Sequence, residues 1–489
     1  MSIKHRRVLR FIFRSAVIAT MLFFIAIIIP PSPIRVGAAS SPPPLNVAPM
    51  GFHSMGTIAL CLSGGGYRAA LFDVGALKRL NDIGLLKHVD HVSSVSGGSI
   101  VGAYLVLHWG DLRWEGIDGA ASNFDDVITT PFRALADTSI EKGALAMGLL
   151  GTKSVARQVA AAYETTLFTK HETLNDLPKS PKLVINATRL EDGSLWTFGQ
   201  DGIAAADWPT NFENGATGDD HRLPLSVAVA SSSAYPPFLA PMILDMTSVV
   251  PTAQQLRNRF GNAIGPNDPD REHFLSKYVS SWSKMAAHVS LVDGGVLNNL
   301  ATEWCSGTGL TFVVDAAAPD ELVSIGRPWS SVVLQVIEDM MSAKEASHNE
   351  LKDSNSGVMS PRSVVIRLKD ALSLSKYGAY RQPLSDLQKI YVKKSLSVSQ
   401  MAALPTALRS LRSDEQNNLL NLGYLIADFA MLQRLQSTEL GTDTLRTLTS
   451  DALKNPLTLP AKVPSCLQSE RNTCDYGKNV LIRLDHILN

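Results

Sequence analysis

Four serines lie close together in one short stretch of the chain, VSSVSGGSIVGAYL, residues 92–105. A β-branched run precedes the glycine pair and a helical pattern follows it, so the stretch predicts a strand, a tight turn and a helix. A serine at such a turn can be a nucleophile that attacks a carbonyl carbon, as in the G-x-S-x-G motif. The alternative is a joint of small residues that only packs a helix against a strand.

The nucleophile turn requires small residues two positions before and two positions after the serine, because the sharp turn packs them together. Ser93, Ser94 and Ser99 each have a valine at one of these positions, whereas Ser96 lies between Ser94 and Gly98. Ser94 stands where the motif has its first glycine, which adds a Cβ and a hydroxyl to the turn. We therefore predict that Ser96 is the nucleophile.

A second candidate motif is the glycine loop SGGGYRA, residues 63–69, which follows an apolar run and precedes a helical pattern. Adjacent glycines at a helix N-terminus can direct several N–H groups at an anion. The anion could be a nucleotide phosphate or the oxyanion of a tetrahedral intermediate. The loop lacks both G-x-G-x-x-G and the Gly-Lys-Ser/Thr of a P-loop. A tight turn that packs a helix remains the alternative.

A nucleophilic serine needs a base, and the sequence offers two kinds. His288, His348 and His486 could complete a Ser-His-Asp triad, but none directly follows a predicted strand. Asp293 does, because HVSLV, residues 288–292, runs into Asp-Gly-Gly. A carboxylate there could remove the hydroxyl proton without a histidine. The alternative is an ordinary turn after a strand.

Taken together, the G-G-G-x-R loop, the serine turn and the later Asp-Gly-Gly resemble the patatin-like phospholipase family. The first loop also resembles that of the cytosolic phospholipase A2 group, and this group shares Ser63 where many patatins have aspartate. PKLVINAT, residues 181–188, and LPLSVAVASSSAYPPFLAP, residues 223–241, resemble further blocks of the patatin-like pattern. The resemblance covers roughly residues 56–320.

The resemblance implies a three-layer α/β/α fold with a mostly parallel sheet, and a Ser–Asp dyad with Ser96 as nucleophile and Asp293 as base. Its implied oxyanion hole contains Gly64, Gly65 and Gly66, and the N–H of Gly97 would lie beside the same oxyanion at the start of a helix. Arg68 matches an arginine that stabilises the substrate phosphate, although it could instead pair with Asp73. No metal or cofactor is implied.

The N-terminal segment predicts export. Six basic residues and no acidic residue precede residue 39, and they flank the apolar run SAVIATMLFFIAIII, residues 15–29. With the small residues at 36–39 this pattern describes a cleaved signal peptide, and an uncleaved membrane anchor or a buried helix are the alternatives. The proline-rich residues 31–49 predict an extended linker that does not bury itself. The zero formal net charge argues against binding nucleic acid through a basic surface.

Hydrophobic periodicity gives the predicted organisation. Apolar runs predict strands at 57–63, 91–95, 182–188, 288–292, 310–316 and 363–368, and helical patterns lie at 67–84, 99–109, 152–168, 329–346 and 414–435. We expect a signal peptide or anchor at 1–38, a Pro/Ser-rich linker at 39–52, an acyl hydrolase domain at 53–370 with a helical insertion at about 110–180, and a helical extension at 371–489.

The four cysteines show no zinc-ligand spacing. Cys61, in an apolar run, and Cys305, in a predicted helix, are expected to be small core residues. Cys466 and Cys474 could form a disulfide in an exported protein.

The sequence therefore predicts an exported or membrane-anchored serine acyl hydrolase that cleaves carboxylic ester bonds of lipids. Its expected partner is a phospholipid or lysophospholipid at a membrane surface, and not nucleic acid; the oligomeric state is not predicted. One alternative is a non-catalytic lipid-binding or scaffold protein on the same fold. Another is a nucleotide-binding enzyme that uses the glycine loop.

Overall fold

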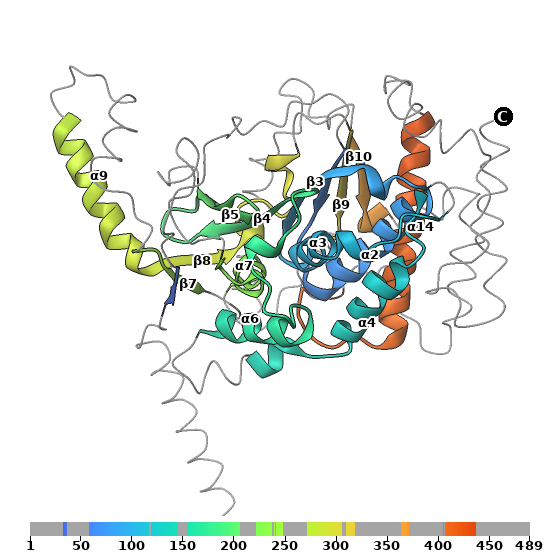
Figure 1. The fold of residues 1–489 in the computed structure, drawn as a ribbon, viewed down its shortest axis with the longest axis horizontal. Coiled ribbons are helices and arrows are strands. Elements are labelled where there is room, and N and C mark those ends of the chain that lie inside the picture. The colour runs from blue at the N-terminus through green and yellow to red at the C-terminus, as the bar shows by residue number, and fades with distance from the viewer. Residues whose placement is uncertain are drawn as a thin grey trace, which may run out of the picture.

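The protein is described here from a computed structural model. It describes residues 33–36, 58–116, 119–144, 154–205, 222–236, 239, 241–247, 271–305, 310–317, 363–370, 404 and 406–436. These residues form one ten-stranded mixed sheet with flanking helices (Figure 1). This is the α/β/α arrangement that the family resemblance implies.

One half of the sheet is parallel and matches the predicted strands. Its strands, in spatial order, are β4 (Lys182–Arg189), β3 (Val89–Val95), β2 (Ile58–Leu62), β9 (Leu310–Asp315) and β10 (Ser363–Arg367). Helix α2 (Gly66–Asp82) connects β2 to β3, and helix α3 (Gly97–Leu107) follows β3. The predicted strand–helix–strand–helix order is confirmed.

Most pairings in the other half are antiparallel, which makes the sheet mixed. Strand β8 (Val289–Asp293) runs antiparallel to both β4 and β7 (Met242–Asp245). Strands β5 (Leu195–Gly199) and β6 (Gly202–Ala205) form a hairpin beside β4. Of the strands β5, β6, β7 and β8, only β8 was predicted from the sequence.

Strand β1 (Ile34–Arg35) adds an edge to the sheet, parallel to β7. The N–H of Val36 donates to the Asp245 carbonyl at 3.0 Å, and the Val36 side chain is buried at 2% exposure. Arg35 Nε lies 3.5 Å from Asp245 Oδ2. The prediction that residues 31–49 do not bury themselves is therefore wrong at 34–36, because an apolar pair there completes the edge beside β7.

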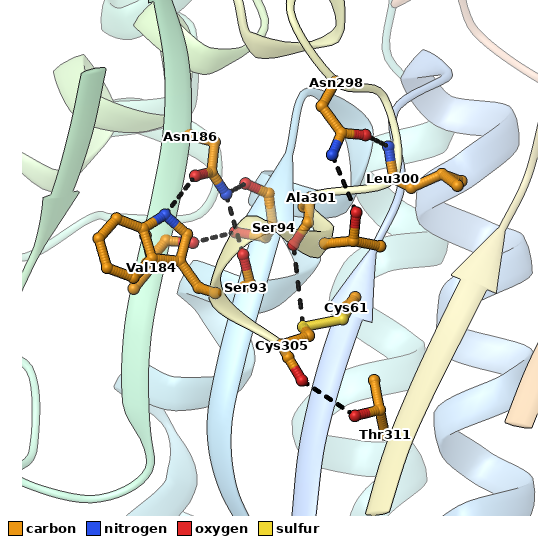
Figure 2. Close-up of a disulfide and its surroundings, with 12 residues drawn as sticks. Cys61, Ser93, Ser94, Val184, Asn186, Asn298, Leu300, Ala301, Cys305 and Thr311 are labelled. Carbon is orange, nitrogen blue, oxygen red and sulfur yellow. Dashed lines mark hydrogen bonds between the residues drawn. A yellow bond between two sulfur atoms is a disulfide. The ribbon is translucent and has the colours of Figure 1, made fainter. Parts of the chain in front are cut away.

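Strands β2 and β9 are buried along their whole length, as their largely apolar sequences require. Leu60 and its alternate neighbours on β2 belong to the large core, whereas Cys61 faces a smaller cluster with Leu300, Cys305 and Val313. A disulfide joins Cys61 to Cys305 across this cluster (Figure 2). Both cysteines are buried core residues, as predicted, but their pairing was not predicted and arises because the chain after β8 folds back over β2. Cys466 and Cys474 lie outside the described residues.

Helices cover the sheet and extend beyond it. Besides α2 and α3 they are α4 (Thr130–Ala136), α6 (Val155–Thr166), α7 (Leu225–Ser232), α9 (Arg271–Met285) and α14 (Ser413–Gln436). Short turns are the π-helix η4 (Asp125–Thr129) and the 3-10 helices η1 (Leu86–His88), η2 (Trp109–Asp111), η5 (Leu174–Asp176), η7 (Ala286–His288), η8 (Gly294–Val296), η9 (Thr302–Trp304) and η10 (Leu368–Asp370). The predicted helix at 329–346 and the apolar run at 15–29 lie outside the described residues. Among the helices that are described, none has the length and apolarity to cross a membrane.

Helix α14 packs along α2 at very short range (Figure 1). A Cβ on Gly423 would lie 2.0 Å from the Phe72 carbonyl oxygen, and one on Gly75 would lie 2.1 Å from that of Leu420. The close approach also buries an ion pair, in which Arg79 Nε donates to Asp428 Oδ1 at 2.7 Å.

This crossing gives a stability prediction. Gly423→Ala should lower the free energy of unfolding by about 1–3 kcal/mol, because the added methyl must push two helix backbones apart. Urea unfolding of the purified protein measures the change. Gly143→Ala is the matched control, because Gly143 is exposed in a helical segment and its added Cβ meets nothing within 4 Å. The control should be neutral or slightly stabilising. Equal losses in both variants would contradict the packing argument.

Candidate active site

Ser96 lies at the turn between β3 and α3, where the sequence predicts a nucleophile. Its backbone φ of 51° and ψ of −120° lie in a region that residues with a side chain rarely occupy. The residue is 4% exposed and immediately precedes the first turn of α3. This is the strained strand-to-helix turn expected of a nucleophile elbow.

The small-residue requirement around Ser96 has a direct geometric cause. A Cβ on Gly98 would lie 2.4 Å from the Leu62 carbonyl oxygen, so α3 can start here only with glycine. On the other side, Ser94 is accommodated because Gly102 faces it: a Cβ on Gly102 would lie 3.1 Å from the Ser94 Cβ. The Ser94 hydroxyl donates to the Val184 carbonyl at 3.2 Å, so the departure from glycine is satisfied within the sheet.

The glycine loop lies against the serine. A Cβ on Gly64 would be 3.0 Å from the Ser96 Cβ, and one on Gly97 would be 2.3 Å from the Gly66 carbonyl oxygen. The N–H of Gly64 donates to the Asn299 carbonyl at 3.0 Å. Within the described ranges, the N–H groups of Gly65, Gly66 and Gly97 have no hydrogen-bond partner.

These free donors stand where two helices begin, since α2 starts at Gly66 and α3 at Gly97. Both helix dipoles favour negative charge at this point. Of the predicted glycines, Gly64 therefore lies beside Ser96 with its own N–H already engaged, and the other three offer donors to an anion.

The sheet register brings Asp293 to the same place. Val95 pairs with Asn186 on β4, and the next β4 residue, Ala187, pairs with Asp293 on β8. Because β8 is antiparallel to β4, its last residue lies beside the last residues of β3. Ser96 and Asp293 are thereby brought to one point from positions far apart in the sequence.

Asp293 is a buried carboxylate, 1% exposed. Burial raises the pKa of Asp293 to about 7, and hydrogen bonds from the Ser96 hydroxyl and the Gly295 N–H oppose the increase. Oδ1 accepts from Gly295 at 2.8 Å, whereas Oδ2 makes no hydrogen bond of good geometry with any described group. The Ser96 hydroxyl therefore lies close enough to lower the Asp293 pKa without making a hydrogen bond of good geometry to Oδ2.

Two asparagines hold these segments together and were not singled out from the sequence. Asn186 donates through Nδ2 to Ser93 Oγ at 3.0 Å and to the Ser94 carbonyl at 2.9 Å (Figure 2). Its Oδ1 accepts from Trp304 Nε1 at 3.1 Å. Asn299 connects the two loops, since its carbonyl binds Gly64 and a Cβ on Gly295 would lie 2.7 Å from its Oδ1. The sequence contains both in the blocks PKLVINAT and DGGVLNN, but gives them no role.

Arg68 is buried on the first turn of α2 and is engaged with the protein itself. Its Nε donates to the Ala316 carbonyl at 3.0 Å, Nη1 donates to the Leu404 carbonyl, and Nη2 lies 3.4 Å from Thr406 Oγ1. The alternative pairing with Asp73 is wrong, because neither Asp73 oxygen has a hydrogen-bond partner among the described residues. A phosphate contact by Arg68 stays a prediction.

Of the three histidines considered for a triad, only His288 lies in the described part, where it is exposed on η7. His348 and His486 lie outside it. The groups that act on the Asp293 pKa are Ser96 and Gly295, with no histidine among them. No group of three or more His, Cys, Asp or Glu side chains suited to a metal lies within the described ranges.

Comparison with known proteins bears on this geometry. Residues 60–303 match the family model of the patatin-like phospholipases. No curated protein matches the chain in sequence.

Several solved structures are similar to the chain. Human GIVD cytosolic phospholipase A2 is 13% identical, with a TM-score of 0.42, over 82% of this chain and 63% of that one. Its complex with methyl gamma-linolenyl fluorophosphonate is 16% identical, with a TM-score of 0.41, over 80% and 59%. VipD from Legionella pneumophila is 13% identical, with a TM-score of 0.25, over 86% and 93%. The chain thus spans less than two thirds of the length of the phospholipase A2 chains that it matches.

The matched residues include the glycine loop, the Ser96 elbow and the Asp293 turn, so the chain carries a domain of the patatin-like phospholipase family.

Proposed function

We propose that the protein is a serine acyl hydrolase that cleaves carboxylic ester bonds of lipids through a Ser96–Asp293 dyad. The observation that supports it best is the pairing of a strained, nearly buried serine with a buried carboxylate whose pKa is about 7. A general base is most effective when its pKa lies near the working pH. The free N–H groups beside Ser96 supply the matching anion site.

The proposed reaction uses these groups in the following order. Ser96 Oγ bonds to the acyl carbon as its proton moves to Asp293 Oδ2, and the carbonyl oxygen becomes an oxyanion near the N–H groups of Gly65, Gly66 and Gly97. When the intermediate collapses, the bond to the leaving alcohol breaks and Asp293 returns the proton to that oxygen. Water then repeats the sequence on the acyl-enzyme, releasing a fatty acid and restoring Ser96.

We propose a phospholipid or lysophospholipid as the substrate class, on the strength of the family match. Arg68 is the proposed contact for the substrate phosphate, at the start of α2 next to Gly65: a Cβ on Gly65 would lie 3.0 Å from Arg68 Nη2. A non-catalytic lipid-binding protein is the alternative that the next experiment separates.

Ser96→Ala and Asp293→Asn should each abolish hydrolysis of a mixed phospholipid and lysophospholipid panel, because one removes the nucleophile and the other the base. Removal of members of such a catalytic unit typically costs on the order of 10⁴-fold or more in kcat. A fluorophosphonate probe should label the wild-type protein and leave Ser96→Ala unlabelled. His288→Ala is the control and should keep its activity. A folded wild-type protein that neither hydrolyses lipid nor reacts with the probe would favour the lipid-binding alternative.

The raised pKa of Asp293 predicts the pH dependence of activity. The base must be ionised, so kcat/KM should rise with pH, reach half its maximum near pH 7 and fall tenfold per unit below that. The pH profile of wild-type hydrolysis measures this. A half-maximum near pH 4 would mean that Asp293 is not desolvated, or is not the base.

The raised pKa of Asp293 also predicts how the stability of the protein depends on pH. The protonated carboxyl of Asp293 favours the folded state, and this contribution is complete below the unfolded pKa of about 3.9 and is lost as pH rises to the folded value. Asp293→Asn carries no charge at any pH. The melting temperature of this variant minus that of the wild type should therefore increase between about pH 4 and pH 7 and stay constant above pH 7.

We also propose that the N-terminal segment stays attached and anchors the protein at a membrane, with β1 as the first described strand after it. Cleavage after the small residues at 36–39 would remove β1, whose Val36 is buried against β7. The supporting contacts are the Val36–Asp245 hydrogen bond and the β1–β7 pairing.

The retention of β1 can be read from the N-terminus of the protein made in cells. N-terminal sequencing and intact mass should find residues 34–36 present, and the protein should stay with membranes after a high-salt wash. A truncated variant that begins at residue 40 should melt at a lower temperature than the full chain. A mature N-terminus beyond Val36 would contradict the proposal.

A further inference from the structure

Three consecutive serines at the end of α7 differ in what they contact. Ser231 Oγ donates to the Val227 carbonyl at 2.8 Å, one turn back in the same helix. Ser233 Oγ donates to the Val229 carbonyl at 2.7 Å, and it also lies 3.3 Å from the Tyr163 hydroxyl. Ser232 instead directs its hydroxyl away from α7 and toward the nucleophile elbow.

Ser232 Oγ is an acceptor for the backbone of the nucleophile itself. The N–H of Ser96 donates to Ser232 Oγ at 2.9 Å, and Ser232 Oγ donates to the Asn186 carbonyl at 2.5 Å. The third neighbour is Ser99 Oγ at 2.9 Å. The single hydroxyl proton of Ser232 goes to Asn186, which leaves a lone pair to accept from the Ser96 N–H, while the Ser99 hydroxyl donates to Ser94 Oγ at 3.1 Å. All four groups are buried, and Ser232 is 0% exposed.

The strained backbone of Ser96 explains why this contact matters. A residue at φ 51° and ψ −120° stays there only when its surroundings fix it. The adjacent N–H of Gly97 is left free as the proposed oxyanion donor. The elbow is therefore fixed through the N–H of Ser96 instead. Ser232 is the group that holds it.

The same segment also holds the base. Two residues after Ser232, the Ala234 carbonyl accepts from the Asp293 N–H at 3.0 Å. Residues 232–234 therefore contact the main chain of both Ser96 and Asp293. Any shift of α7 would move these two residues relative to one another.

We propose that Ser232 is a positioning residue that, with Ala234, sets the separation of Ser96 and Asp293. The inference rests on the proposed hydrolase function. Without the Ser232 hydroxyl, the Ser96 N–H loses its acceptor and the elbow can relax, which misplaces Oγ with respect to Asp293 and to the free glycine N–H groups. A misplacement of about 1 Å can cost up to ~100-fold in rate.

The test compares Ser232→Ala with Ser231→Ala, which removes an equally buried hydroxyl from the preceding position of the same helix. Ser232→Ala should lower kcat for lysophospholipid by at least ~10-fold with KM unchanged, and should slow fluorophosphonate labelling of Ser96 by a similar factor. Ser231→Ala should keep both rates. Ser232→Cys retains a weak acceptor at the same position and should fall between Ser232→Ala and the wild type.

Melting temperatures separate positioning from loss of fold. If Ser232→Ala melts no lower than Ser231→Ala and still loses its rates, the positioning role stands. If Ser232→Ala does not fold, the labelling rate of Ser232→Cys decides, and a rate equal to the wild type overturns the proposal. Equal rates in Ser232→Ala and Ser231→Ala also overturn it. An unreactive wild-type protein would instead overturn the hydrolase function itself.

Discussion

The site depends on how closely three backbone segments approach one another. The loop after β2, the elbow after β3 and the turn after β8 meet largely through main chain and glycines, with the Asn299 side chain between the first and the last. A Cβ on Gly98 would lie 2.4 Å from one carbonyl oxygen, and a Cβ on Gly294 would lie 2.3 Å from the Asn186 carbonyl oxygen. Glycine at these positions is therefore required by distance, because no rotamer could relieve a clash with main chain. This close contact leaves the N–H groups beside Ser96 directed into one small space.

Close contact also desolvates Asp293, the proposed base. Asp293 is enclosed by β4, the segment after α7 and its own turn; Oδ1 accepts the Gly295 N–H, and the Ser96 hydroxyl is the other group that lowers the pKa of the carboxyl. If the carboxylate had several donors, its pKa would fall and it would be a poor base at neutral pH. If it had none, its charged form would be too costly to bury. One backbone donor and one loosely placed hydroxyl give a value near 7, which suits removal and return of a proton.

The residues proposed for the chemistry are easier to find in the sequence than the partners that position them. The strand before the glycine loop is a continuous apolar run, and the strand before Ser96 mixes valines with polar residues; with the glycines after each they predict a parallel sheet and its functional edge. The antiparallel strand β7 is short, and β5 and β6 form a hairpin without strong apolar patterning. None of these three strands therefore gives a clear signal in the sequence. The Cys61–Cys305 disulfide spans 244 residues of sequence, and only the return of the chain over β2 brings the two sulfurs together. Ser232 is one of three adjacent serines, and only the direction in which α7 ends tells them apart.

The C-terminal part of the chain contributes to the same site, although the family model ends at residue 303. The Ala407 carbonyl accepts from the Tyr67 N–H at 3.1 Å, and a Cβ on Gly66 would lie 2.4 Å from that carbonyl oxygen. Leu404 accepts from Arg68, and α14 then packs along the rest of α2. The segment predicted as a helical extension thus fixes the helix whose first residue carries one of the free N–H groups. Because the Gly66 N–H, a proposed oxyanion donor, is main chain, its position depends on where α2 lies, and Leu404, Ala407 and α14 all contact that helix.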